Sequence, residues 1–141
     1  MNLAKIVGSS IALAICIIWS YSVYYFWEPS GFNQNSLAYF LKVDNEVKSF
    51  PILGAIKEPL YKVGAADGLK RTAVIVDYPT KYSEKHLTQE LEFIDFICRF
   101  PPQEAYFICE KTDKQKRVIS AIFSKKKGTD NLKANITFIG F

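Results

Sequence analysis

The sequence predicts an α+β fold, in which an N-terminal transmembrane helix precedes a small domain with one long helix packed on a largely antiparallel sheet of about five strands. Three observations lead to this prediction. Residues 6–27 form an uncharged apolar run, residues 83–100 carry apolar side chains at helical spacing, and residues 105–141 alternate short apolar runs with polar turns. The composition, with 49% hydrophobic and 23% charged residues among 141, is typical of a folded protein and excludes a disordered or low-complexity chain.

The apolar run at residues 6–27 predicts a membrane-spanning helix. Its 22 residues would rise about 33 Å, enough to cross a hydrocarbon core of about 30 Å. A cleaved signal peptide has a shorter apolar core followed by small residues, whereas bulky aromatic residues follow here. A lipoprotein is the other alternative, because residues 13–16 resemble a lipobox, but Ile15 is too large for that motif and an apolar stretch follows Cys16.

The flanks of this run predict its orientation and its membrane interface. Lys5 is the only charged side chain among the first 27 residues, so the positive-inside rule places the N-terminus in the cytoplasm. We therefore expect residues 1–30 to form a single transmembrane signal-anchor of the inner (plasma) membrane, and residues 31–141 to form one periplasmic or extracellular domain. Amphipathic aromatic rings favour the headgroup level. Those expected at the outer interface are Trp19, Tyr21, Tyr24, Tyr25 and Trp27.

The first half of the exported region predicts a short helix and a strand hairpin. Residues 33–41 favour a helix capped by Asn33 or Asn35, and residues 44–59, with two prolines, are expected to be irregular. The next elements are strands at residues 60–63 and 72–78, joined by a Gly-bounded loop at residues 64–68. Because residues 73–76 are apolar on both faces, we expect their strand to be central and covered on both sides.

Residues 83–100 have the clearest helical pattern of the exported region. Ser83 suits the N-cap, and Asp95 and Arg99 have the spacing of a helical ion pair. The apolar stripe expected to face the sheet consists of Leu87, Leu91, Ile94 and Cys98, widened by Phe93, Ile97 and Phe100. Two prolines end this helix. Three strands then complete the sheet as an antiparallel meander, at residues 105–110, 117–124 and 134–141.

Cys98 and Cys109 both lie in the exported region, where a disulfide can form. With Cys98 on the helix and Cys109 on the next strand, their Cα atoms would not come within the roughly 4.4–6.8 Å that a disulfide needs, unless the helix crossed the strand or were shorter. We therefore expect two buried free thiols, with the disulfide as the alternative.

The sequence contains no recognisable catalytic, cofactor-binding or metal-binding pattern. His86 is the single histidine, which excludes a multi-histidine metal site, and its position near a helix start favours an exposed structural role. Ser124 and Lys127 match the Ser-x-x-Lys spacing, but a strand end and a turn are expected there instead of the helical turn that this pair requires. We therefore predict neither a cofactor nor a bound metal.

Positive charge is concentrated toward the C-terminus. Residues 111–141 hold eight basic and two acidic residues, a balance of +6, whereas residues 31–110 hold nine basic and eleven acidic residues. Most of the basic residues belong to two turns, and they are Lys111, Lys114, Lys116, Arg117, Lys125, Lys126 and Lys127. We interpret these turns as solubilising segments that protect strand edges, with a site for a protein partner or lipid headgroups as the alternative. No nucleic-acid-binding module is recognisable, so nucleic acid is not an expected partner.

Together these features predict a membrane-anchored, extracytoplasmic binding protein without catalytic activity. An immunity or inhibitor protein that neutralises a toxin or hydrolase fits this description, and so does an accessory subunit of an envelope complex. The expected partners are therefore the membrane and another protein. The alternative is an envelope-acting enzyme whose active site, built on His86 or on a pair of carboxylates, is not recognisable from the sequence.

Overall fold

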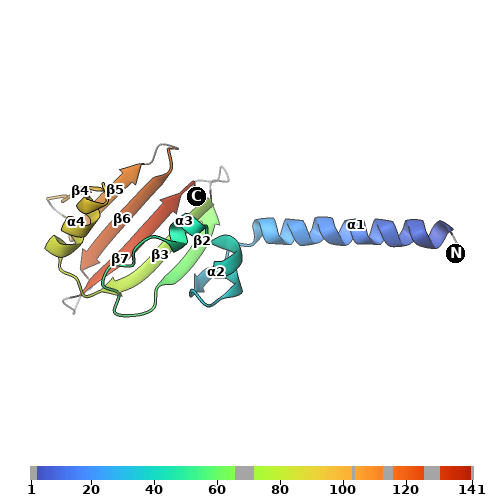
Figure 1. The fold of residues 1–141 in the computed structure, drawn as a ribbon, viewed down its shortest axis with the longest axis horizontal. Coiled ribbons are helices and arrows are strands. Elements are labelled where there is room, and N and C mark those ends of the chain that lie inside the picture. The colour runs from blue at the N-terminus through green and yellow to red at the C-terminus, as the bar shows by residue number, and fades with distance from the viewer. Residues whose placement is uncertain (1–2, 66–71, 103, 113–115, 126–130, 141) are drawn as a thin grey trace.

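The computed structural model describes residues 3–65, 72–102, 104–112, 116–125 and 131–140. A long helix projects from a domain built on one antiparallel sheet (Figure 1). The predicted α+β class is confirmed, although the described residues form seven strands instead of about five. The helices are α1 (Leu3–Phe26), α2 (Leu37–Lys42), α3 (Asn45–Lys48) and α4 (Glu84–Phe93).

The strands are β1 (Ser30–Phe32), β2 (Leu60–Ala65), β3 (Thr72–Thr80), β4 (Ile97–Arg99), β5 (Tyr106–Thr112), β6 (Val118–Lys125) and β7 (Leu132–Ile139). Their order in the sheet is β1-β2-β3-β7-β6-β5-β4, and every neighbouring pair is antiparallel. The five predicted strands agree with β2, β3, β5, β6 and β7 to within two residues at each end. The two additional strands, β1 and β4, are the short edges of the sheet. Of the predicted hairpin loop, Gly64 and Ala65 belong to β2, and the rest lies outside the described residues.

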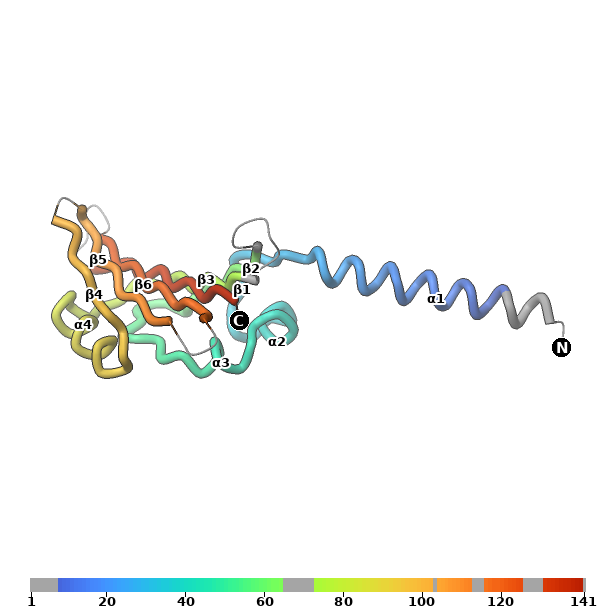
Figure 2. Tube along the Cα trace, turned by 90° about the horizontal axis from the view of Figure 1, so that it is seen from above, coloured from blue at the N-terminus to red at the C-terminus, as the bar shows by residue number. Residues whose placement is uncertain are grey.

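The hydrophobic core lies between the sheet and its helices, which cover one face only (Figure 2). Val74 and Val76 of β3 point into this core and are almost fully buried, as are Leu87 and Leu91 of α4. Alternate residues of β3 therefore face the core, and the i, i+4 pair of α4 is buried as its helical spacing predicts.

The expected cover on both sides of β3 is not found among the described residues. Ile75 alternates with Val74 and Val76, so it points to the opposite face of the sheet, and it is only partly buried. Its cross-strand neighbours are Lys62 of β2 and Thr137 of β7. These neighbouring side chains, instead of a second helical layer, partly shield Ile75.

The helix predicted over residues 83–100 ends early, at Phe93. Ile94 is its C-cap, and Asp95 has φ of 68°, a left-handed conformation that Asp tolerates better than most residues. The chain then turns back, so Phe96 enters the core and β4 pairs with β5. The β-branched and aromatic residues of this stretch favour a strand, and backbone pairing with β5 stabilises it there. The expected helical pair of Asp95 with Arg99 is therefore wrong, and Asp95 lies 3.8 Å from the ammonium of Lys111 instead.

The segment between β1 and β2 holds two short helices. Ser36 caps α2 by accepting a hydrogen bond from the Tyr39 N–H at 3.1 Å, so neither Asn33 nor Asn35 is the cap. The helix begins four residues later than predicted. The next segment, expected to be irregular throughout, contains the single turn of α3.

Candidate functional site

Helix α1 is long and apolar enough to cross a membrane. Residues Gly8–Phe26 form 19 helical residues with a mean hydropathy of 1.5, and none of this stretch is buried in the protein. The five aromatic residues expected at the membrane interface lie exposed on this helix or directly after it. Their position at headgroup level remains a prediction.

The last turns of α1 contact the end of α2. The Tyr24 hydroxyl donates a hydrogen bond to the Leu41 carbonyl at 2.9 Å, and the Lys42 ammonium donates to the Tyr24 carbonyl. The Lys42 Nζ also lies 3.8 Å from the centroid of the Tyr24 ring, a cation–π geometry. Partial burial in this junction lowers the pKa of Lys42. The end of the apolar helix is therefore fixed beside α2.

Helix α2 exposes three large apolar side chains on the face turned away from the core. Leu37, Phe40 and Leu41 are 68%, 73% and 41% exposed, and their i, i+3, i+4 spacing places them together. On the other side of the helix, Ala38 is buried and the Tyr39 ring packs at 4.9 Å from that of Tyr61. We call Leu37, Phe40 and Leu41 the proximal apolar cluster. The sequence analysis assigned no role to these residues, although their spacing next to the anchor could have identified them.

A second set of exposed apolar residues lies at the opposite edge of the sheet. Phe93, Ile97 and Phe100 are 88%, 67% and 51% exposed, and we call them the distal apolar cluster. Phe93 ends α4, Ile97 begins β4 and Phe100 directly follows β4, at the end of the domain farthest from α1 (Figure 1). The ring of Phe100 stacks on that of Phe107 on the core face, with centroids 5.4 Å apart, whereas Ile97, one residue before Cys98, points to the opposite face. The sequence analysis assigned all three to the buried stripe of a long helix. That assignment is wrong, because α4 ends at Phe93 and the following residues alternate in and out along β4.

Tyr39 of α2, Tyr61 of β2 and Tyr78 of β3 form a cluster in which both Tyr39 and Tyr78 interact with Tyr61. Tyr78 accepts a hydrogen bond from the Leu53 N–H at 3.2 Å, and burial raises its pKa to about 12. Burial, followed by the charge and the hydrogen bond of Tyr61, raises the pKa of Tyr39 to about 12. Burial therefore favours the protonated, uncharged form of Tyr39 and of Tyr78.

Two of the four basic-turn residues that the structure describes are engaged within the domain. The Lys111 ammonium donates a hydrogen bond to the Ile94 carbonyl at 2.7 Å, and Arg117 forms an ion pair with Glu46 at 2.6 Å. Lys116, two residues before β6, and Lys125, its last residue, are exposed and are separated by the length of this strand, roughly 24 Å. Lys114, Lys126 and Lys127 lie outside the described residues. The described residues of the two turns therefore do not form one continuous basic patch.

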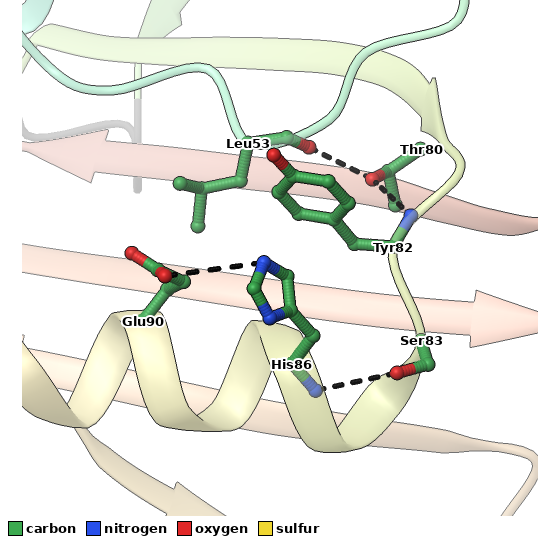
Figure 3. Close-up of polar contacts among 6 residues, drawn as sticks. All are labelled: Leu53, Thr80, Tyr82, Ser83, His86 and Glu90. Atoms are coloured by element: carbon green, nitrogen blue, oxygen red, sulfur yellow. Dashed lines mark hydrogen bonds and ion pairs between the residues drawn. The ribbon is translucent and has the colours of Figure 1, made fainter.

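His86 lies on the first turn of α4, as predicted, and its side chain is about half exposed (Figure 3). The imidazole Nε2 lies 3.9 Å from the Glu90 carboxylate, and the ring packs edge-on against Tyr82 with centroids 4.3 Å apart. The nearby hydroxyls have backbone partners: Ser83 accepts from the His86 N–H at 3.4 Å, and Thr80 donates to the Leu53 carbonyl at 2.7 Å. Within the described part of the chain, no hydroxyl is hydrogen-bonded to the imidazole as a nucleophile would be.

Cys98 and Cys109 form a disulfide, which corrects the expectation of two free thiols. They are direct cross-strand partners of β4 and β5, with Cα atoms 4.0 Å apart. The geometric argument against the bond failed because Cys98 lies on a strand and not on a helix. Cys16, exposed on α1, is a free thiol.

A cleft of about 740 Å³ lies beside β1, between β2, β3 and the start of β7. Leu60 and Pro79 line its apolar part, and Lys57, Lys62 and Lys133 are its basic residues. Lys133 is 3.4 Å from Asp77, so part of this positive charge is neutralised locally. No group of three or more His, Cys, Asp or Glu side chains gathers to hold a metal among the residues that were described.

The chain matches no protein family, no curated protein and no solved structure. A functional conclusion therefore rests on its own residues and their arrangement.

Proposed function

We propose that this protein is a single-pass, membrane-anchored binding protein without catalytic activity, and that its domain binds another protein through the distal apolar cluster. The observation that carries the proposal is the exposure of Phe93, Ile97 and Phe100, between 51% and 88%, on the edge far from α1. Large apolar side chains that stay exposed along one edge of a folded domain are a feature of interaction surfaces. Aromatic side chains of this kind are also enriched among the residues that dominate binding energies.

Two features support an extracytoplasmic position for the domain. Lys5 precedes the apolar span, and positive charge on that flank favours a cytoplasmic N-terminus. The disulfide between Cys98 and Cys109 is a bond that forms and persists in oxidising compartments such as the periplasm or the cell exterior. We therefore assign α1 to the inner (plasma) membrane and the domain to its outer side.

Mass spectrometry of the protein extracted from membranes tests this topology. We expect an intact N-terminus and the mass of an oxidised cysteine pair, because the apolar run is long and lacks a small-residue cleavage site. A mature N-terminus near residues 20–30, or a lipid attached to Cys16, would contradict the anchor.

The edge position of the cluster suits a protein partner. β4 has only three residues and is the last strand of the sheet, so a partner can approach its open side. The disulfide ties β4 to β5, which holds Ile97 in a fixed position before binding. A surface arranged in advance loses less conformational entropy on association.

Affinity purification from solubilised membranes tests the binding proposal. We expect a discrete protein to co-purify with the wild-type chain and to be lost from a Phe93→Ser, Ile97→Ser variant. A Leu37→Ser, Phe40→Ser variant is the matched control, because it also replaces one exposed phenylalanine and one exposed aliphatic residue, in the proximal cluster. Retention of the partner by the distal variant, or its loss from the control alone, would contradict the proposal.

The identity of the co-purifying protein separates the two versions of the proposal. A single toxin-like or hydrolytic protein would indicate an immunity or inhibitor protein. A multi-subunit assembly would indicate an accessory subunit of an envelope complex. In either case the distal variant should lose the partner while its domain stays folded, since exposed positions contribute little to stability.

A further inference from the structure

We propose that α2 is an interfacial helix, and that the proximal apolar cluster inserts into the headgroup and acyl boundary of the leaflet where α1 ends. This inference rests on the membrane-anchor part of the proposed function. It adds a second, peripheral contact between the domain and the lipid bilayer.

The depth of α2 follows from its contacts with α1. Tyr24 precedes Phe26, the last residue of the apolar span, by two residues, or about 3 Å along the helix axis. The Tyr24 hydroxyl bonds the Leu41 carbonyl at 2.9 Å, so the end of α2 lies at the level where the span leaves the hydrocarbon. The six residues of α2 extend about 9 Å, and the two views, turned by 90° from each other, place this helix beside the domain end of α1 (Figures 1 and 2). The whole helix therefore lies close to the membrane surface.

The orientation of α2 is fixed by the core. Ala38 is buried, and Val43 at the C-cap is 3% exposed, so this side of the helix is attached to the domain. Leu37, Phe40 and Leu41 consequently occupy the free side and cannot turn inward without detaching the helix. A helix with one apolar face at membrane level lies in the interface with that face inserted by about 5–10 Å.

The charges around the cluster also fit a lipid surface. The Lys48 ammonium donates a hydrogen bond to the Phe40 carbonyl at 3.2 Å and lies 5.6 Å from the centroid of the Phe40 ring. Lys42 lies at the opposite end of the cluster, against Tyr24. Long basic side chains beside inserted apolar ones extend their charges toward phosphate groups, and juxtamembrane lysines favour anionic lipids.

Insertion of α2 would restrict the orientation of the domain. The chain between α1 and β1 is short, but a single attachment still permits rotation about it. A second contact at α2 holds the opposite edge of the sheet, with Phe93 and Ile97, away from the bilayer. The proximal contact therefore presents the distal cluster to a partner.

Depth-dependent quenching of tryptophan fluorescence tests the proposal on the full chain. Both native tryptophans are first removed by Trp19→Phe and Trp27→Phe. A single tryptophan is then introduced by Phe40→Trp or Leu37→Trp. Each full-length variant is reconstituted in vesicles of phosphatidylcholine and phosphatidylglycerol. The matched control is Phe93→Trp, which replaces an aromatic residue of similar exposure on the distal edge. Lipids brominated near the headgroup end of the acyl chain should reduce emission of the Phe40→Trp chain about twofold or more and leave the Phe93→Trp chain unchanged.

A chain that keeps only the native Trp19, through Trp27→Phe, reports insertion of α1 separately. Quenching of Trp19 together with equal, weak quenching at positions 37, 40 and 93 would overturn the interfacial helix and leave the anchor intact. Equally strong quenching at positions 40 and 93 would also overturn it, because the domain would then lie flat on the bilayer. Absence of quenching at Trp19 would overturn the anchor and this inference with it.

Discussion

The two ends of the domain expose similar apolar residues in opposite surroundings. The proximal cluster on α2 contacts the end of an apolar helix and is flanked by Lys42 and Lys48. At the distal end, Phe93 lies between Glu92 and Asp95 in sequence, and both carboxylates are exposed. Exposure alone does not identify what covers an apolar surface, so we propose lipid for the proximal cluster and a protein for the distal cluster on the basis of their neighbouring residues.

The largest expected effect on stability comes from weakening the packing of α4 on the sheet. Leu91 is fully buried between α4 and the sheet, so Leu91→Ala should reduce the free energy of unfolding by about 2–5 kcal/mol. Glu92→Ala, one residue away on the exposed side, should change it by less than about 0.5 kcal/mol. Chemical unfolding of the full chain in micelles measures both. Similar losses for the two variants would mean that the buried face of α4 is wrongly assigned.

The disulfide should affect the distal end only. Replacing Cys98 and Cys109 by Ser should cost about 2–3 kcal/mol, because the bond closes a loop of only 11 residues in the unfolded chain. Partner binding should weaken as well, since β4 loses its link to β5. Cys16→Ser, on α1, is the control and should change neither stability nor partner binding. An unchanged stability after loss of the bond would show that β4 is held by its backbone pairing alone.

Alkaline pH should lower the free energy of unfolding through the buried Tyr78. Burial raises the pKa of Tyr78 to about 12, so the folded protein holds this proton more tightly than the unfolded chain does. The stability contribution is therefore complete below about pH 10 and is lost as the pH rises toward 12, by roughly 2 kcal/mol for this group. Unfolding measured between about pH 9 and 11 should show a smaller decline for Tyr78→Phe than for the wild type, whereas Phe at the exposed Tyr106 should leave the decline unchanged. An identical decline in Tyr78→Phe would contradict this assignment.

The smallest expected effect is at His86. Its imidazole is half exposed and contacts Tyr82 and Glu90, so His86→Ala should leave stability and partner binding near wild type. The enzyme alternative predicts instead a fall of about 10²–10⁴ in rate when a general acid or base is removed. Loss of the cellular function in a folded His86→Ala protein that still binds its partner would favour the enzyme.

The periodicity of the sequence predicted the individual strands and the start of α4. The strand at residues 72–78 and the helical spacing of Leu87 and Leu91 follow from residues close together in the chain, and both elements were confirmed. The expected cover on both faces of that strand was wrong. The end of α4 was not predictable in this way. Ile94 and Cys98 fit the helical stripe, but pairing with β5 and the bond to Cys109 outweigh that preference, and both are long-range contacts.

The same limit applies to the exposed clusters. The apolar span was visible from length and hydropathy alone, so the membrane contact could be predicted. Phe93, Ile97 and Phe100 were misassigned because one error in the helix boundary turned three exposed residues into core residues. The interfacial role proposed for Leu37, Phe40 and Leu41 depends on the contact between Tyr24 and Leu41, which fixes the position of α2 and could not be predicted from the sequence.

Site-specific photo-cross-linking in native membranes tests the central claim most directly. Benzoyl-phenylalanine replaces Phe93 in one full-length chain and Phe40 in another, two positions of comparable exposure at opposite ends of the domain. We predict a discrete protein adduct from position 93, and lipid adducts without a protein adduct from position 40. A protein adduct from position 40 with none from position 93 would contradict the assignment of the two ends.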